Sequence, residues 1–136
     1  SIALPSVTLT TEPQLDGTQV ITIGFPAPII INVSLDPYGN YQGGQFFLKS
    51  HANEGIISAK YEMGIKTIYE LNVGWHHGES GGPIAIPFMP PTVFSIMQNY
   101  RNIQSPHGIM AGPHCGCDFL NIQNELTLLG IDLKKV

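Results

Sequence analysis

Short runs of β-branched and aromatic residues alternate with clusters of Gly, Pro, Asn and Asp along most of the chain. Such runs, bounded by turn residues, are typical of β-strands. They predict strands at residues 7–10, 18–25, 29–35, 45–49, 55–61, 67–73, 83–86, 92–100 and 108–111, with turns at 16–17 and 36–40. Many short strands at this spacing indicate an all-β antiparallel barrel or sandwich.

The end of the chain follows a different period. Apolar residues recur there at steps of three and four, as on one face of a helix: Phe119, Ile122, Leu126 and Leu129. Asp118 is placed to cap the start of this helix, and Gly130 is placed to end it. We therefore expect one C-terminal helix packed on an all-β body.

Composition narrows the class of protein. The 136 residues are enough for one domain. A composition with 43% hydrophobic and 12% charged residues excludes intrinsic disorder. The net charge is −4 and no Lys/Arg cluster occurs, so no nucleic-acid partner is expected. No apolar run is long enough to span a bilayer, so no membrane partner is expected either. The chain begins at Ser1 without a Met, and we expect its natural N-terminus upstream.

The hexapeptide Gly78-Glu79-Ser80-Gly81-Gly82-Pro83 carries the most chemical information. A serine attacks a carbonyl carbon only if its hydroxyl is exposed and the charge developing on the oxygen is stabilised. Glycines on both sides of Ser80 permit backbone angles closed to other residues and let amide N–H groups face an oxyanion. The same letters fit the nucleophile elbow Gly-x-Ser-x-Gly, but that motif needs a following helix, and Ile84-Ala85-Ile86-Pro87 is β-like.

The hexapeptide resembles the Gly-Asp-Ser-Gly-Gly-Pro signature of trypsin-like serine peptidases, with Glu79 in place of the usual Asp or Asn. The flanks resemble bacterial HtrA-like members: residues 17–26 are similar to the opening of the family's second barrel, and Gly55-Ile56-Ile57-Ser58-Ala59 is similar to its Gly-x-Val-Ser segment. The resemblance covers nearly the whole chain, but only as the C-terminal half of the family's fold. It implies a six-stranded antiparallel β-barrel with a C-terminal helix over residues 1–136, without the N-terminal barrel.

The resemblance also implies roles for individual residues. Ser80 would be the catalytic nucleophile, and the N–H groups of Gly78 and Ser80 would form the oxyanion hole. Val73-Gly74-Trp75 would form the floor of the specificity pocket, and Ser95-Ile96-Met97 would pair with the substrate backbone as an added strand. None of the 5 histidines has the neighbours of the family's catalytic His, so the His and Asp would come from the missing N-terminal half. The isolated chain is therefore expected to be inactive.

Two functions follow from these expectations. The first is a serine endopeptidase that hydrolyses peptide bonds of a protein substrate through an acyl-enzyme on Ser80. The second is a catalytically inactive relative that binds peptides or a partner protein at the same edge. Phe46-Phe47 is interpreted as strand packing, with one ring on each side.

A zinc-binding module is a third interpretation, since imidazole and thiolate groups suit a tetrahedral metal. The candidate ligands are His107, His114, Cys115 and Cys117. A Cys-x-Cys pair is geometrically awkward for one metal, and His107 stands apart from the other three. We favour a Gly/Pro-rich loop with two free thiols, and expect neither a metal nor a cofactor.

Overall fold

A computed structural model describes residues 6–26, 28–74 and 78–133 of the chain. Within these ranges the polypeptide forms nine strands followed by a short 3-10 helix and a short α-helix. The strands are β1 (Thr8–Leu9), β2 (Gln19–Gly24), β3 (Ile29–Leu35), β4 (Tyr41–Phe47), β5 (His51–Met63), β6 (Lys66–Leu71), β7 (Pro83–Ile86), β8 (Thr92–Ser105) and β9 (Gly108–Asp118). The helices are η1 (Phe119–Ile122) and α1 (Gln123–Leu128).

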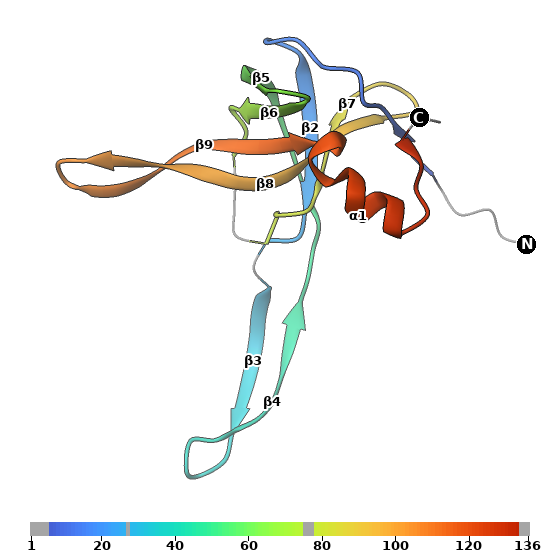
Figure 1. Cartoon of the computed structure of the whole chain (residues 1–136). Helices are drawn as coiled ribbons and strands as arrows, with labels where there is room; N and C mark the ends of the chain where they lie inside the picture. The colour runs from blue at the N-terminus through green and yellow to red at the C-terminus, as the bar shows by residue number, and fades with distance from the viewer. Residues whose placement is uncertain (1–5, 27, 75–77, 134–136) are drawn as a thin grey trace, which may run out of the picture.

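Six of these strands close into an antiparallel barrel in the order β8-β7-β2-β5-β6-β9, and β9 pairs again with β8 (Figure 1). The short strand β1 joins from outside, parallel to the start of β8. The prediction of an all-β, six-stranded antiparallel barrel with a C-terminal helix is thereby confirmed. Closure leaves the six barrel strands without a free long edge over their shared length.

One hydrophobic cluster fills the barrel. It includes the rings of Tyr69 and Phe94, which meet edge to face with centroids 5.0 Å apart. Each barrel strand except β9 contributes to this cluster: Val20, Ile57, Tyr69, Leu71, Ile84, Phe94 and Met97, together with Val73 just after β6. Alternation along β2 and β6 places every second side chain inward, as the pleat of a strand requires.

A second cluster lies between the barrel wall and the helices. Phe119 and Leu133 pack there against Ala85 and Val93. Asp118 caps η1, because its side chain accepts a hydrogen bond from the Asn121 N–H at 3.0 Å. The helix α1 ends just before Gly130, which adopts φ +78°. Both cap predictions are confirmed, although the first turn is 3-10 rather than α. No helix of the described ranges is long and apolar enough to cross a bilayer.

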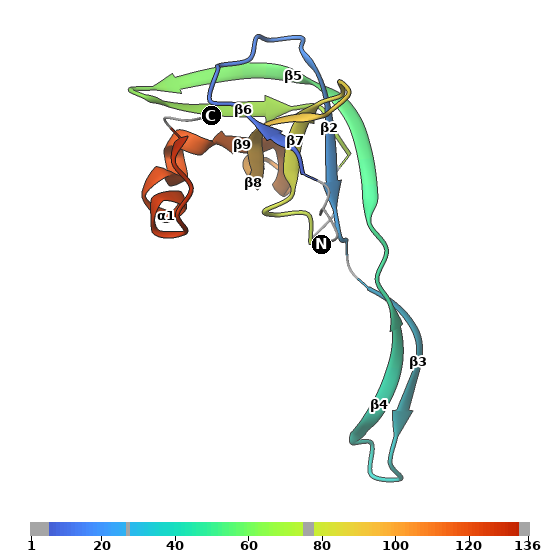
Figure 2. The same cartoon turned by 90° about the vertical axis from the view of Figure 1, so that its right-hand side faces the viewer.

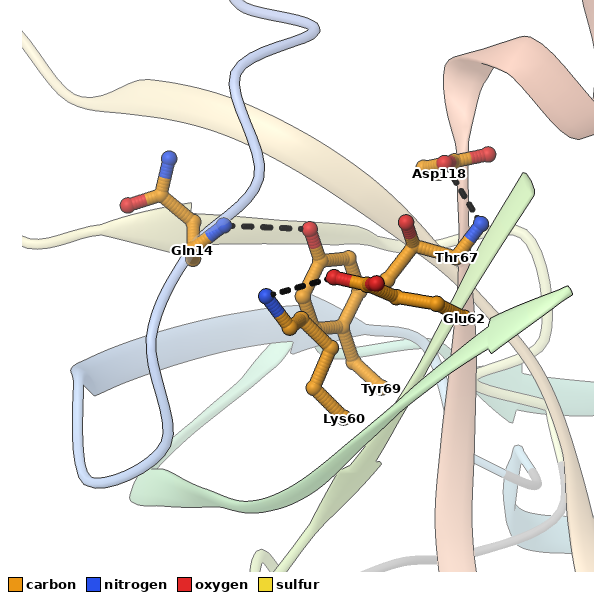
Figure 3. A network of polar contacts seen from close by, with 6 residues as sticks. All are labelled: Gln14, Lys60, Glu62, Thr67, Tyr69 and Asp118. Carbon is orange, nitrogen blue, oxygen red and sulfur yellow. Dashed lines mark hydrogen bonds and ion pairs between the residues drawn. The ribbon is translucent and has the colours of Figure 1, made fainter. Parts of the chain in front are cut away.

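Polar contacts tie the N-terminal loop and the helix to one end of the barrel (Figure 3). The buried Tyr69 hydroxyl accepts a hydrogen bond from the Gln14 N–H at 3.1 Å, and Asp118 Oδ2 accepts one from the Thr67 N–H at 2.7 Å. Beside them, the partly buried Lys60 and the exposed Glu62 form an ion pair with an N–O distance of 3.0 Å. Burial raises the pKa of Tyr69 above its usual value, because the ionised phenol loses water. The phenol therefore stays a neutral anchor for the loop.

The strands β3 and β4 form a separate two-stranded arm that projects far from the barrel (Figures 1 and 2). Among the described elements, the two strands make extensive contacts only with each other. The arm's turn is well specified: Asp36 Oδ1 accepts hydrogen bonds from the N–H groups of Tyr38 and Asn40, both at 2.8 Å. The pKa of Asp36 is lowered mainly by the side-chain hydrogen bond from Asn40 Nδ2 to Asp36 Oδ2 at 2.9 Å, and further by these backbone contacts, so the predicted turn at 36–40 is held by a charged acceptor.

Two expectations about local structure need revision. Phe46 and Phe47 lie on a strand, β4, as interpreted, but that strand belongs to the arm and both residues are 52% exposed instead of packed. The segment 112–118 is not a loop but the second half of β9, paired with β6 and β8. Gly112 and Pro113 on β9 lie opposite the point on β8, between Tyr100 and Asn102, where the register of the two strands shifts. Such an irregularity accommodates a proline, because proline has no N–H to donate to the neighbouring strand.

We predict that Gly116→Ala destabilises the barrel by about 1–3 kcal/mol, the usual cost of overpacking a filled core. A Cβ on Gly116 would lie 2.2 Å from Ile84 Cδ1 and 2.6 Å from Ser95 Oγ, both in fully buried residues. The exposed Gly74, where a Cβ meets no atom within 4 Å, provides the control Gly74→Ala. Thermal unfolding should show a lower Tm for the first variant only; equal melting of both would contradict this packing.

Candidate functional site

The hexapeptide forms a tight turn that leads into β7. The Gly82 N–H donates to the Glu79 carbonyl at 2.9 Å, and Gly81 adopts φ +85°, as the third residue of such a turn requires. The turn is joined to β8 because the Gly81 N–H donates to Met97 O at 2.7 Å and the Met97 N–H donates to Gly82 O at 2.8 Å. The loop is therefore part of the hydrogen-bonded wall of the barrel.

The glycines of this turn pack against the backbone at the end of β2. A Cβ on Gly78 would lie 2.2 Å from the Phe25 carbonyl oxygen, and one on Gly82 would lie 2.3 Å from that of Ile23. Neither distance is compatible with a side chain. The backbone contacts alone account for glycine at these two positions, whether or not the turn has a chemical role.

Glu79 anchors the turn to strands β2 and β5. Its side chain is only 2% exposed, and its Oε1 accepts a hydrogen bond from Asn53 Nδ2 at 3.0 Å. Its Cα and Cβ lie against Gly24, where an added Cβ would come within 2.8 Å of each. On β9, burial lowers the pKa of His114, and the negative charge of Glu79 partly offsets this. The residue that departs from the trypsin-like signature is thus a buried structural carboxyl held by β5.

Ser80 itself is exposed at the corner of the turn. It borders an open recess of about 340 Å³ that is lined by residues 23–25 and 78–83. Among the described residues, neither its hydroxyl nor the N–H groups of Gly78 and Ser80 form a hydrogen bond. The catalytic and oxyanion roles stay predictions, and exposure of the hydroxyl is compatible with them.

The side chains predicted to bind substrate lie elsewhere. Val73 and Met97 belong to the interior cluster, and Ser95 is fully buried with its hydroxyl donating to Cys117 O at 2.8 Å. Gly74 is exposed but does not line the recess at Ser80, and neither does Ile96. Trp75 lies outside the described residues. The structure therefore does not bring these side chains to Ser80.

The strand-addition role of Ser95-Ile96-Met97 needs correction. Residues 95 and 96 pair with β7 on one side, and residues 95 to 97 pair with β9 on the other. The backbone of Met97 is also engaged by Gly81 and Gly82. An added strand needs a free edge, and this segment of β8 has none in the closed barrel.

The Cys and His residues of the metal interpretation are spread along the β8–β9 hairpin. Cys117 is buried, Cys115 is partly buried, and burial raises the pKa of both thiols, which disfavours thiolate at neutral pH. Within the described ranges, no three such side chains are grouped to hold a metal. Asn53, which the sequence reasoning missed, carries no motif; its position opposite Thr22 on β2 became visible only with the register.

Comparison with known protein families, curated proteins and solved structures finds no match to this chain. The resemblance to trypsin-like peptidases therefore rests on the hexapeptide and its flanks.

We predict that Asn53→Ala lowers the free energy of unfolding by about 1.5–3 kcal/mol, because it removes a donor from a buried acidic side chain. The control is Gln19→Ala, which removes a similar amide contact to the exposed Glu54. Urea titrations should show less than about 0.5 kcal/mol for the control. Equal midpoints for the two variants would show that the Glu79 contact does not hold the turn.

Proposed function

We propose that this chain is an assembly subunit that binds a protein partner through the β3–β4 arm, and that it does not act as an enzyme by itself. This is the partner-binding alternative of the sequence analysis, moved from the barrel edge to the arm. The observation that supports it is that the arm exposes large apolar side chains and that no other described element covers them.

The composition of the arm supports this proposal. Ile29, Ile30 and Ile31 are 60%, 59% and 62% exposed, and Asp36 is the sole charged residue from position 18 to position 48. An isolated two-stranded hairpin has marginal stability in water, because neither of its faces is covered. Exposed apolar surface of this extent on a soluble protein marks a site of interaction. A partner that covers the arm would supply the packing that the hairpin lacks.

A serine peptidase is the second candidate function. The exposed Ser80 hydroxyl on a turn anchored by the buried Glu79 favours it. This proposal needs a His and an Asp from a further barrel, and a substrate-binding mode other than strand addition at residues 95–97.

The arm proposal predicts that the barrel folds without the arm. In a shortened chain, residues 28–49 are replaced by a four-residue Gly-Ser turn between β2 and β5, which pair up to Gly24 and His51. The variant should unfold cooperatively, stay monomeric and bind less hydrophobic dye than a full chain whose arm is free. The full chain should either self-associate, which covers its apolar arm, or stay monomeric and bind the dye anilinonaphthalene sulfonate through the free arm. A full chain that does neither would refute the proposal.

The peptidase proposal predicts that a fluorophosphonate probe labels Ser80 in a longer protein that also carries the first barrel. Labelling should disappear in Ser80→Ala and persist in Ser58→Ala, which alters another exposed serine of the same barrel. The chain of residues 1–136 alone should stay unlabelled, because a serine without a general base is a weak nucleophile. Labelling that survives Ser80→Ala, or an intact folded protein that takes no label, would exclude this function.

A further inference from the structure

We propose that the partner of the arm is a second copy of this chain, and that the arm of one copy docks on the barrel of the next. This inference rests on the proposed function and deepens it by naming the occupant and the receiving surface. The arm and the receiving surface are different parts of one chain, so the contact closes either by reciprocal exchange of two arms or head to tail.

The base of the arm is apolar on both of its faces. Ile29-Ile30-Ile31 on β3 lies beside Phe46-Phe47 on β4, with Ile29 opposite Phe47 and Ile30 opposite Phe46. Consecutive strand residues point to opposite faces, so each face carries isoleucine and phenylalanine side chains. In a strand with one solvent-exposed face, apolar and polar residues alternate along the sequence, whereas a strand that is covered on both faces has a continuous apolar sequence. Both faces of the base of the arm therefore carry apolar surface that a partner can bury.

The area of the arm is sufficient for a stable interface. Its exposed large apolar residues are Ile29, Ile30, Ile31, Val33, Leu35, Tyr38, Tyr41, Phe46, Phe47 and Leu48. At roughly half exposure they present on the order of 1,000 Å² of surface, taking about 200 Å² for a fully exposed large side chain. A standard protein–protein interface buries about 800 Å² on each partner. The apolar area of the whole arm is therefore of the size that a standard interface buries on one partner.

The same chain carries a receiving surface of matching chemistry. A recess of about 70 Å³ opens on the barrel wall between β2, β7 and β8, and only apolar residues line it, among them Val7, Ile21, Ile23 and Pro83. Val7 and Ile23 are themselves 53% and 42% exposed. A small apolar recess with an exposed apolar rim suits an anchoring side chain such as isoleucine or phenylalanine.

Charge favours a copy of the same chain over a charged partner. Neither the lining of the recess nor the two strands of the arm contain a charged residue, and Asp36 lies at the turn. An uncharged arm has no electrostatic means of selecting a differently charged protein. Every copy supplies one arm and one recess, so two copies can exchange arms in a two-fold dimer, or successive copies can form a ring or a filament.

The experiment compares three double variants of the full chain by light scattering after size exclusion. The arm variant is Ile30→Asp with Phe46→Asp, and the recess variant is Val7→Asp with Ile23→Asp. The control, Ile65→Asp with Leu128→Asp, changes two apolar residues that are 74% and 88% exposed and lie elsewhere. The unaltered chain and the control should form dimers or larger assemblies, and the arm and recess variants should be monomeric, with association weakened about a hundred-fold or more.

Mixing the two monomeric variants is the decisive step. The intact arm of the recess variant should dock on the intact recess of the arm variant, giving a one-to-one heterodimer; this outcome also shows that both variants are folded. A dimer of the unaltered chain that only the arm variant breaks, with no rescue on mixing, would overturn docking on the barrel in favour of arm-to-arm pairing. An unaltered chain that is monomeric yet binds hydrophobic dye would overturn self-assembly and leave the proposed function standing. Loss of assembly in the control would show that any exposed apolar residue supports association, and would also overturn the inference.

Discussion

Closure of the sheet between β8 and β9 determines what the rest of the molecule is able to do. Once β9 has paired with both β6 and β8, the backbone of the barrel strands is satisfied by neighbours over their shared length. A closed barrel offers a peptide no strand to extend. This removes the binding mode that the resemblance implied for residues 95–97. The free backbone edges of β3 and β4 lie instead on the projecting arm, which also carries uncovered apolar surface.

The signature hexapeptide shows how a functional motif and a structural requirement coincide. Gly78 and Gly82 are needed where the turn lies against β2, and Gly81 is needed for its positive φ. Glu79 fills a buried position that Asn53 completes. Four of the six letters are thus explained by packing and turn geometry without any reaction. Ser80 and Pro83 are left, and because only Ser80 carries a reactive group, it is the proper target for a chemical test.

Much of the architecture was predictable because strands and turns depend on local sequence. Each of the nine strands of the described ranges was expected in position, and β3 and β7 were expected with their observed bounds. The helix cap at Asp118 and the stop near Gly130 followed from side-chain chemistry. What failed required knowledge of pairing. The apolar run around Phe46 has the same pattern whether it lies in a core or on an arm, and the continuation of β9 past Pro113 depended on an irregularity in its partner.

The same reasoning explains why the site was only partly predictable. Exposure of Ser80 follows from its glycine neighbours, but burial of Ser95 depends on a Cys117 carbonyl that lies 22 residues away in sequence and is adjacent only once β8 and β9 pair. An alternating apolar pattern gives the inward face of a strand but not its neighbours. Residues that act through contacts across the barrel, such as Asn53 with Glu79, therefore escape a reading of the sequence alone.

The arm also places a constraint on how the chain exists in solution. Natural sheet proteins protect exposed strands with charges, prolines or bulges, because bare apolar strands pair with other chains. The arm has register irregularities between Ile30 and Asn32 and between Ser34 and Leu35, and one charge at its turn, but no lysine or glutamate on either strand. Its edges are therefore irregular while its faces are unprotected. Edge-to-edge growth of a sheet is disfavoured and face-to-face burial is not, which is the combination that a docking arm requires.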